Sequence, residues 1–217
     1  MYQFASVALA VGLASGATGQ LVITEVYAGL PGNDGTADWI ELTNIGETAT
    51  FSNLFYDDAS ASILAGGDLP EFTLAKNASV VILVSVDATD ALAEIDRFVS
   101  VWGTGIPVLV ADGGSLGTTD TAYILDELGD VVADFSFAPP LSNQLATIER
   151  IEDSQRNSVE GENGAVASNA FTNTSLGLPG DLAQLIGSPG SALSFVPSPG
   201  SGVLLGIAAL AGARRRR

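Results

Sequence analysis

Hydrophobic and polar positions alternate in short runs through residues 21–151, which is the pattern of β-strands separated by turns. The first run, "LVITEVY", predicts a strand with two faces: Val22, Thr24 and Val26 against Ile23, Glu25 and Tyr27. The next run, "DWIELTN", also has two faces: Ile40 and Leu42 against Trp39, Glu41 and Thr43. The loop "PGNDG" (residues 31–35) lies between them. The chain therefore begins its folded part with two consecutive strands.

One segment departs from the strand pattern and predicts a short helix. Its apolar residues recur at helical spacing: Leu92, Ile95, Phe98 and Val99. Three residues before it suit an amino-terminal cap: Asp87, Thr89 and Asp90. We expect this helix to cover one end of a β-sandwich. After Ile151 the chain is polar with little periodicity, which predicts a long surface loop.

Both ends of the chain read as processing segments. The apolar run "FASVALAVGLA" and the small residues after it predict a signal peptide over residues 1–19. At the other end, residues 200–213 are apolar or small and are followed by four arginines. A helix of this length reaches about 21 Å, less than the ~30 Å of a bilayer core, so it is a marginal membrane span. The arginines would keep the carboxyl end in the cytoplasm and leave the rest outside.

A proline pair, a short apolar helix and a terminal arginine cluster, in this order, resemble the PEP-CTERM sorting signal. The resemblance implies that the tail is recognised by exosortase, a membrane protease-transpeptidase, and that the cargo is a surface or matrix protein. The sequence has Ser198 where the family typically has Glu. A plain membrane anchor is the alternative. The residues that carry the resemblance are Pro197, Pro199, Arg214, Arg215, Arg216 and Arg217.

The order "ITEVYA…DWIELTN.G…TATFSNLFYDD" resembles the opening of the lamin tail domain. Later stretches keep the same plan: "LPEFTLAKNASVVILVS", residues 113–137 with their acidic turn, "QLATIERI" and the Pro-Gly turn of "SLGLPGD". The resemblance implies an all-β fold, an immunoglobulin-like β-sandwich, with the one short helix. The expected organisation is a signal peptide (1–19), the sandwich (20–181), a Ser, Gly and Pro-rich linker (182–196) and the sorting tail (197–217).

The amino-acid composition excludes several kinds of binding and catalysis. Residues 20–195 hold all 25 acids but only four basic residues, so 4 − 25 gives a net charge of −21, which repels nucleic acid and anionic lipid. The chain has no Cys and no His, which excludes thiol and imidazole catalysis and the usual zinc sites. Paired carboxylates could still cleave glycosidic bonds, but no pair lies in a recognisable motif. We therefore expect no catalytic residues and no organic cofactor.

Carboxylates also suit a divalent cation such as Ca²⁺. Asp34 and Asp38 flank a glycine turn, and Asp57 and Asp58 end a strand, so these four are the candidate ligands. The alternative is that they are ordinary turn residues exposed to solvent. Trp39 could stack on a sugar, although packing is the expected role for a tryptophan in this strand.

These observations predict a non-catalytic module that is exported to the cell surface or extracellular matrix and acts by adhesion or scaffolding. Its expected partners are an exosortase-type protease, the membrane before processing, and extracellular polysaccharide or surface proteins. Two alternatives stay open. One is a calcium-dependent polysaccharide- or protein-binding domain, and the other is an accessory domain to a secreted hydrolase.

Overall fold

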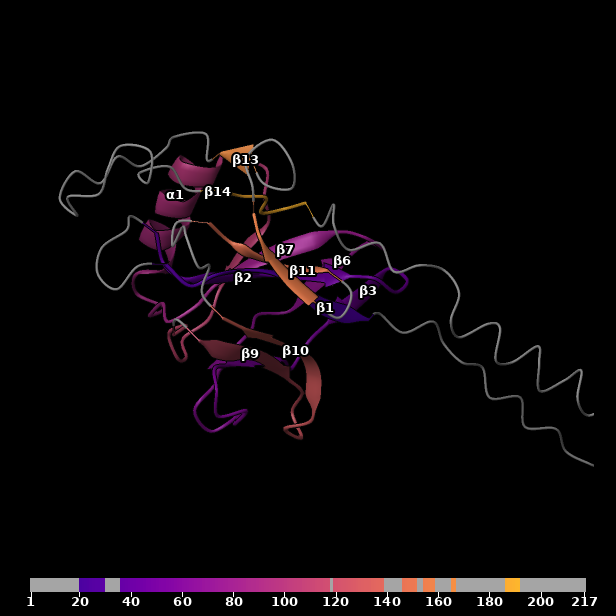
Figure 1. The fold of residues 1–217 in the computed structure, drawn as a ribbon. Helices are drawn as coiled ribbons and strands as arrows, with labels where there is room; N and C mark the ends of the chain where they lie inside the picture. The colour runs from indigo at the N-terminus through magenta and orange to yellow at the C-terminus, as the bar shows by residue number, and fades with distance from the viewer. Residues whose placement is uncertain are drawn as a thin grey trace, which may run out of the picture.

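The computed structural model describes residues 20–29, 36–117, 119–138, 146–151, 154–158, 165–166 and 186–191. Within these ranges the chain is mostly β-sheet with one helix, as predicted (Figure 1). None of the helical structure in this part of the chain is long and apolar enough to cross a membrane. The predicted signal peptide, the turn at 175–181 and the sorting tail lie outside the described residues.

Strands and helix follow one another in an order close to the predicted one. The first half contains β1 (Leu21–Tyr27), β2 (Trp39–Asn44), β3 (Ala49–Phe51), β4 (Phe55–Asp57), β5 (Gly67–Asp68), β6 (Phe72–Leu74) and β7 (Ser79–Leu83). The second half contains α1 (Ala91–Trp102), β8 (Val108–Val110), β9 (Asp120–Leu125), β10 (Val131–Phe137), β11 (Ile148–Ile151), β12 (Ser154–Asn157), β13 (Ala165–Val166) and β14 (Ile186–Gly187).

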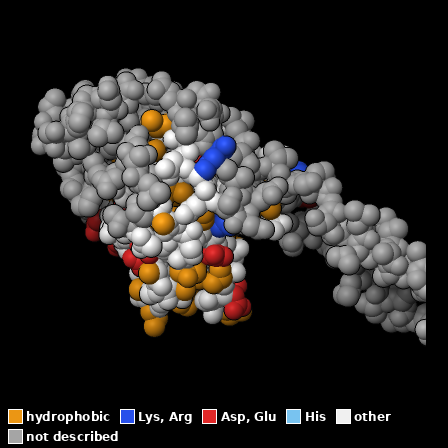
Figure 2. Space-filling view, in the orientation of Figure 1, with side chains coloured by type: hydrophobic (Ala, Val, Ile, Leu, Met, Phe, Trp, Pro, Cys, Tyr) orange, Lys and Arg blue, Asp and Glu red, His pale blue; other side chains and the backbone are white. Residues whose placement is uncertain are grey.

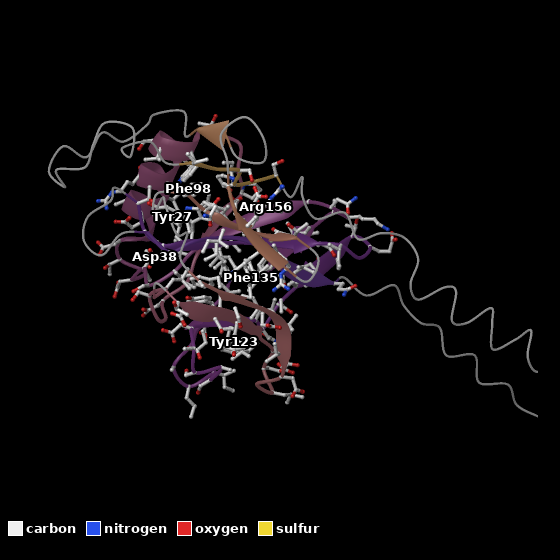
Figure 3. All side chains as sticks on the ribbon, in the orientation of Figure 1. Tyr27, Asp38, Phe98, Tyr123, Phe135 and Arg156 are labelled. Atoms are coloured by element: carbon white, nitrogen blue, oxygen red, sulfur yellow. The ribbon has the colours of Figure 1, made fainter. Side chains whose placement is uncertain are left out.

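Two sheets make the body. The larger is six-stranded, in the order β12-β11-β1-β2-β7-β8, and the smaller is four-stranded, in the order β10-β9-β4-β5. Neighbouring strands are antiparallel except β7 and β8. Two short pairs, β3–β6 and β13–β14, complete the arrangement. The sheets face each other, and Figure 3 shows Phe135 between them, which is the expected layout of a β-sandwich.

The inner faces of the two sheets form one apolar core. Ile40 and Leu42 of β2 belong to it, as their alternation predicted, and Tyr56 and Ile124 reach it from the smaller sheet. The β9–β10 hairpin turns at Asp126, whose carboxylate accepts from the backbone N–H groups of Leu128 and Asp130. The predicted strand pair with an acidic turn is therefore confirmed.

The helix covers the outer face of the six-stranded sheet near the carboxyl end of β1, and so closes a second apolar cluster (Figure 3). Trp39 is fully buried there, with ring centroids 5.7 Å from Trp102 and 6.0 Å from Phe98. Its predicted packing role is confirmed. Leu92 was expected on the packed face of the helix, but it is 80% exposed, because the buried positions are Phe98, Val101 and Trp102.

The predicted regular alternation in β1 is wrong. The register with β2 shifts between Ile23 and Glu25, which is the signature of a β-bulge. As a result Ile23 and Val26 both lie in the inner core, while Thr24 bonds to side chains of the opposite, outer face. The bulge places two consecutive polar residues, Thr24 and Glu25, on that outer face.

Two predicted irregular segments are more ordered than expected. Directly after Ile151, the polar stretch forms β12, which pairs with β11 from Ile148↔Asn157 to Ile151↔Ser154. Residues 186–191, which the sequence suggested as part of a linker, lie against the outer face of the large sheet. Hydrogen bonds to buried side chains, described below, account for their position.

Truncating Phe98 tests the placement of the helix. We expect Phe98→Ala to lower the free energy of unfolding by about 3–5 kcal/mol, because it empties a fully buried site among aromatic rings. Leu92→Ala on the same helix should change it by less than about 0.5 kcal/mol. Urea unfolding of both variants measures the difference, and equal losses would contradict the observed orientation of α1.

Candidate functional site

A row of three buried glutamates lies across the outer face of the six-stranded sheet. Glu149 of β11, Glu25 of β1 and Glu41 of β2 are direct cross-strand partners. Their exposed fractions are 3%, 1% and 0%. Carboxylates directly opposite one another repel when ionised, and burial adds a desolvation cost. We call these three residues the carboxylate row, and it is the least expected feature of this sheet.

Hydroxyl groups of neighbouring strands surround the row. A line of hydrogen-bonded hydroxyl groups crosses β1, β2 and β7, with 2.8 Å between successive oxygens. Its members are Thr24, Thr43 and Ser79. At the β1 end of this line the Thr24 hydroxyl donates to Glu41 Oε1 at 2.6 Å. At the β11 side the Thr147 hydroxyl donates to Glu25. The threonines and serine thus serve as donors to a face that water does not reach.

A segment from near the end of the chain covers the row. Residues 186–191, called the strap here, start beside β11, where the Thr147 N–H donates to the carbonyl of Ile186 at 2.9 Å. Ser188 N–H donates to Glu25 Oε1 at 2.8 Å, and Gly190 N–H donates to Glu41 Oε2 at 2.6 Å. The strap therefore crosses from β11 over β1 to β2, and the carboxylates satisfy its backbone donors.

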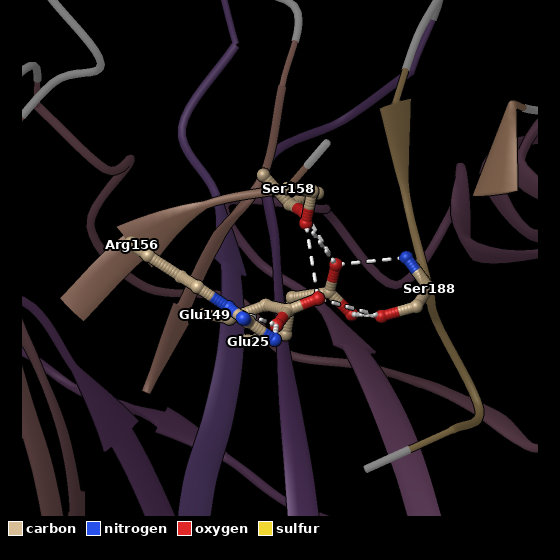
Figure 4. Close-up of polar contacts among 6 residues, drawn as sticks. Glu25, Glu149, Arg156, Ser158 and Ser188 are labelled. Atoms are coloured by element: carbon tan, nitrogen blue, oxygen red, sulfur yellow. Dashed lines mark hydrogen bonds and ion pairs between the residues drawn. The ribbon is translucent and has the colours of Figure 1, made fainter. Parts of the chain in front are cut away.

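Two serine hydroxyls each reach two carboxylates (Figure 4). Ser188 Oγ lies 3.2 Å from both Glu25 Oε2 and Glu149 Oε1. Ser158 Oγ lies 3.2 Å from Glu149 Oε1 and 3.4 Å from Glu25 Oε1. A hydroxyl has one proton to donate, so a second hydrogen bond at the same oxygen needs a proton from the carboxyl group. The geometry thus favours a row that keeps at least one carboxyl protonated.

A single basic side chain contacts the row within the described ranges. Arg156 of β12 lies 3.2 Å from Glu149 Oε2 through Nη2 and 3.3 Å through Nε (Figure 4). Glu149 is therefore the member whose charge is compensated. The neighbouring Arg150 instead donates to backbone carbonyls of Ile23 and Asp134 and lies over the Phe135 ring.

The pKa values of the other two members are raised. Burial, followed by the charge of Glu41, raises the pKa of Glu25 from 4.5 to about 8, against the hydrogen bonds from Thr147 and Ser188. Burial raises the pKa of Glu41 from 4.5 to about 7, against the hydrogen bonds from Thr24 and Gly190. Perturbed carboxyls of this kind can act as general acids in catalysis. Here, however, their oxygens accept from the strap and from neighbouring hydroxyls.

The sequence did not single out the row. Glu25 and Glu41 were placed on the Tyr27 and Trp39 faces of their strands, but nothing in either strand predicted a cover for those faces. The signal that could have located the row is the recurrence of one Glu close to one Thr in three stretches: "ITEV", "IELT" and "TIER". The strap is separated from β1 by some 160 residues, and no local pattern connects the two.

The predicted cation ligands lie elsewhere, around Tyr56. Asp38 Oδ2 accepts from the backbone N–H of Leu116 at 3.1 Å, and Asp58 packs against the backbone of Gly114. The pKa of Asp58 is raised by burial and then by the charges of Asp57 and Asp120. Asp34 lies outside the described residues, as do all six residues of the predicted sorting signal.

Asp57 is fully buried, so its predicted solvent exposure is wrong. Its predicted role in a turn is confirmed, because Oδ2 accepts from Ser60 Oγ at 2.6 Å and from the Ser62 N–H at 2.7 Å. Across the part of the chain that the structure covers, no group of three or more Asp or Glu side chains has a geometry that could hold a metal ion.

Comparison with protein-family models and with curated proteins finds no match for this chain.

The carboxylate row makes stability depend on pH. Because the folded pKa values of Glu25 and Glu41 lie above the ordinary 4.5, their contribution is fully present below pH 4.5 and is lost as pH rises through 7 and 8. We expect the free energy of unfolding to fall by about 2 kcal/mol or more over this window. Chemical denaturation at a series of pH values measures it.

The control for this pH series is a pair of charge-removing variants. Glu25→Gln cannot ionise at the row, so its stability should fall less steeply with pH. Glu71→Gln, which removes the same charge at an exposed position, should keep the slope of the unchanged chain. A slope that is flat in the unchanged chain, or equally reduced by both variants, would show that the row does not titrate as described.

Proposed function

We propose that this protein is a non-catalytic module that is exported, sorted by its carboxyl-terminal tail and retained at the cell surface or in the extracellular matrix, where it acts by adhesion or scaffolding. The module is an immunoglobulin-like sandwich of the lamin tail type, and exosortase-type processing acts on the tail. Extracellular polysaccharide and surface proteins are its proposed surroundings.

The observation that carries the proposal is the strap. It is the last described segment before the proposed sorting residues, and the body binds it through Glu25, Glu41 and the Thr147 backbone. A force applied to the tail reaches the strap before it reaches the strands of the two sheets. Hydrogen bonds distributed over three strands resist that pull together. This is a suitable attachment for a displayed domain.

The use of the acidic groups supports a non-catalytic role. The most perturbed carboxyls, Glu25 and Glu41, are occupied by hydroxyl and backbone donors and covered by the chain itself. A substrate would have to displace the strap to reach them. Since the chain has no His or Cys, acid/base chemistry would fall to its carboxyl, tyrosine and lysine side chains. The row is better explained as a structural site that binds the strap to the sheet.

Neutralising the terminal arginines tests the sorting part of the proposal. We expect replacement of Arg214, Arg215, Arg216 and Arg217 by Gln to abolish surface location and the processed mass, because the positive cluster no longer stops translocation. Cell fractionation and mass spectrometry in an exosortase-bearing bacterium provide the measurement. A control is Lys76→Gln with Arg97→Gln, which removes two exposed positive charges from the body and leaves the tail unchanged. Unchanged location and mass in the tail variant would refute sorting by this tail.

One buried carboxylate oxygen favours a second candidate function, which is calcium-dependent binding. Asp57 Oδ1 is buried and has no hydrogen-bond partner among the residues that the structure describes. A carboxylate oxygen without a donor suits a cation, and Asp58 and Asp120 raise the local negative charge.

Calorimetry with calcium chloride decides between the two candidates. If calcium binds beside Asp57, we expect measurable heat and a raised melting temperature in the unchanged chain, and neither in Asp57→Asn. Asp96→Asn, an exposed helix position, serves as the control. The absence of heat and of any shift in melting temperature in the unchanged chain would remove the calcium candidate.

A further inference from the structure

The sandwich has a second feature that neither the fold nor the strap uses: an open cleft of about 710 Å³ on one side. It lies where the edge strands of the two sheets come together, β5 of the four-stranded sheet and β8 of the six-stranded sheet. Beside these edges, Gly67 of β5 touches Asp112, which follows β8 in the chain. A Cβ built on Gly67 would lie 1.2 Å from the carbonyl oxygen of Asp112, so the backbones are in direct contact there.

The cleft combines apolar walls with two carboxylates. Pro70, Val86 and Val110 supply the walls, and Ala88 lies at its exposed rim. Asp68 and Asp112 supply the carboxylates, and both residues are exposed. Within the described part of the chain, neither carboxylate has a hydrogen bond or an ion pair.

No basic residue of the described body is placed to neutralise these acids. Lys76 pairs with Glu47, Arg97 with Glu94 and Arg156 with Glu149. Arg150 binds backbone carbonyls and the Phe135 ring. The space-filling view shows acidic side chains on the lower part of this face of the molecule (Figure 2).

Further acids lie behind the cleft. Gly113 lines it and packs on the Tyr56 ring, and the adjacent Gly114 packs on Asp58. Burial, and then the charges of Asp57 and Asp120, raise the pKa of Asp58, so these neighbouring acids add to the negative charge behind the cleft. The field favours a cation at the mouth of the cleft.

We propose that this cleft binds a lysine or arginine side chain of a basic peptide segment on a partner protein. The aliphatic stem of such a side chain packs on Pro70, Val86 and Val110, and its charged end lies between Asp68 and Asp112. Charge complementarity selects this occupant. Nucleic acid and anionic polysaccharide are repelled, and none of the described residues that line the cleft is aromatic, so they offer no ring on which a neutral sugar would stack.

A bare metal ion fits the cleft less well than a side chain does. Asp68 and Asp112 are the two acids among the described residues that line the cleft, and no group of three or more Asp or Glu side chains in the described residues could hold a metal ion. An ion would also leave the apolar walls without a partner. An alkyl chain that ends in a cation uses both features at once.

The test is fluorescence anisotropy of labelled tetra-arginine and tetra-lysine peptides with the full chain, and a tetra-citrulline peptide as the neutral control. We expect both basic peptides to bind at low salt and the citrulline peptide not to bind. Asp68→Asn with Asp112→Asn should weaken binding about tenfold or more, and high salt should weaken it as well. Ala88→Arg should weaken binding too, because it places a competing guanidinium at the rim.

The matched control removes two charges elsewhere. Asp96→Asn with Asp130→Asn changes the net charge equally at exposed positions away from the cleft, and should leave the affinity within about twofold. Equal weakening by both double variants would mean general charge attraction and would overturn the proposal. So would binding of spermidine as tightly as of the peptides, or displacement of the peptides by stoichiometric calcium.

This inference goes beyond the proposed sorting, and the two can fail separately. Peptide binding is measured in solution and does not need processing of the tail, whereas the arginine replacement at residues 214–217 measures location only. A chain that is sorted but does not bind basic peptides would refute the cleft alone.

Discussion

The burial of three glutamates in one cross-strand row is the constraint on which the outer half of this structure depends. Ionised carboxylates at Glu149, Glu25 and Glu41 would repel one another in a medium of low dielectric. The structure lowers that cost in three ways. Arg156 compensates one member, burial raises the pKa of the other two so that they hold a proton to higher pH, and hydroxyl groups of neighbouring strands donate to the remaining oxygens. The hydrogen bonds to the row also hold Arg156 and the donating hydroxyl groups in place.

The dependence between the strap and the row is mutual. The strap contains only a two-residue strand, so most of its backbone donors have no strand neighbour to accept them. Glu25 and Glu41 replace that neighbour. Close approach also needs small residues, since a Cβ at Gly187 would lie 2.7 Å from Thr147 Cγ2 and 3.0 Å from the Trp102 ring. The same ring belongs to the aromatic cluster under α1, so the helix and the strap share one support.

Much of the fold could be predicted because its signals are local. Alternation located β2 and its inner face, and the acidic turn at Asp126 located the hairpin of β9 and β10. The site could not be predicted in the same way. The bulge beside Thr24 follows from pairing with β2 and has no mark in "LVITEVY" itself, and the position of the strap depends on contacts across more than a hundred residues. The prediction for Leu92 was wrong because helical spacing shows only which residues lie on the same face of a helix. Packing against the sheet decides which of them are buried.

The strap and the cleft lie on opposite sides of β7, and this has a mechanical consequence. The strap crosses β11, β1 and β2, while the cleft is bounded by β8 and by the segment that follows β7. β7 connects the two, because it pairs with β2 through five residues and with β8 through three, and Val86 N–H donates to the Ala111 carbonyl just beyond. All five of its residues are buried. A pull between the tail and a partner in the cleft would therefore pass through a strand that is buried along its whole length. The parallel β7–β8 pair has fewer hydrogen-bonded positions than the antiparallel β7–β2 pair, so the cleft side should open before the strap side does.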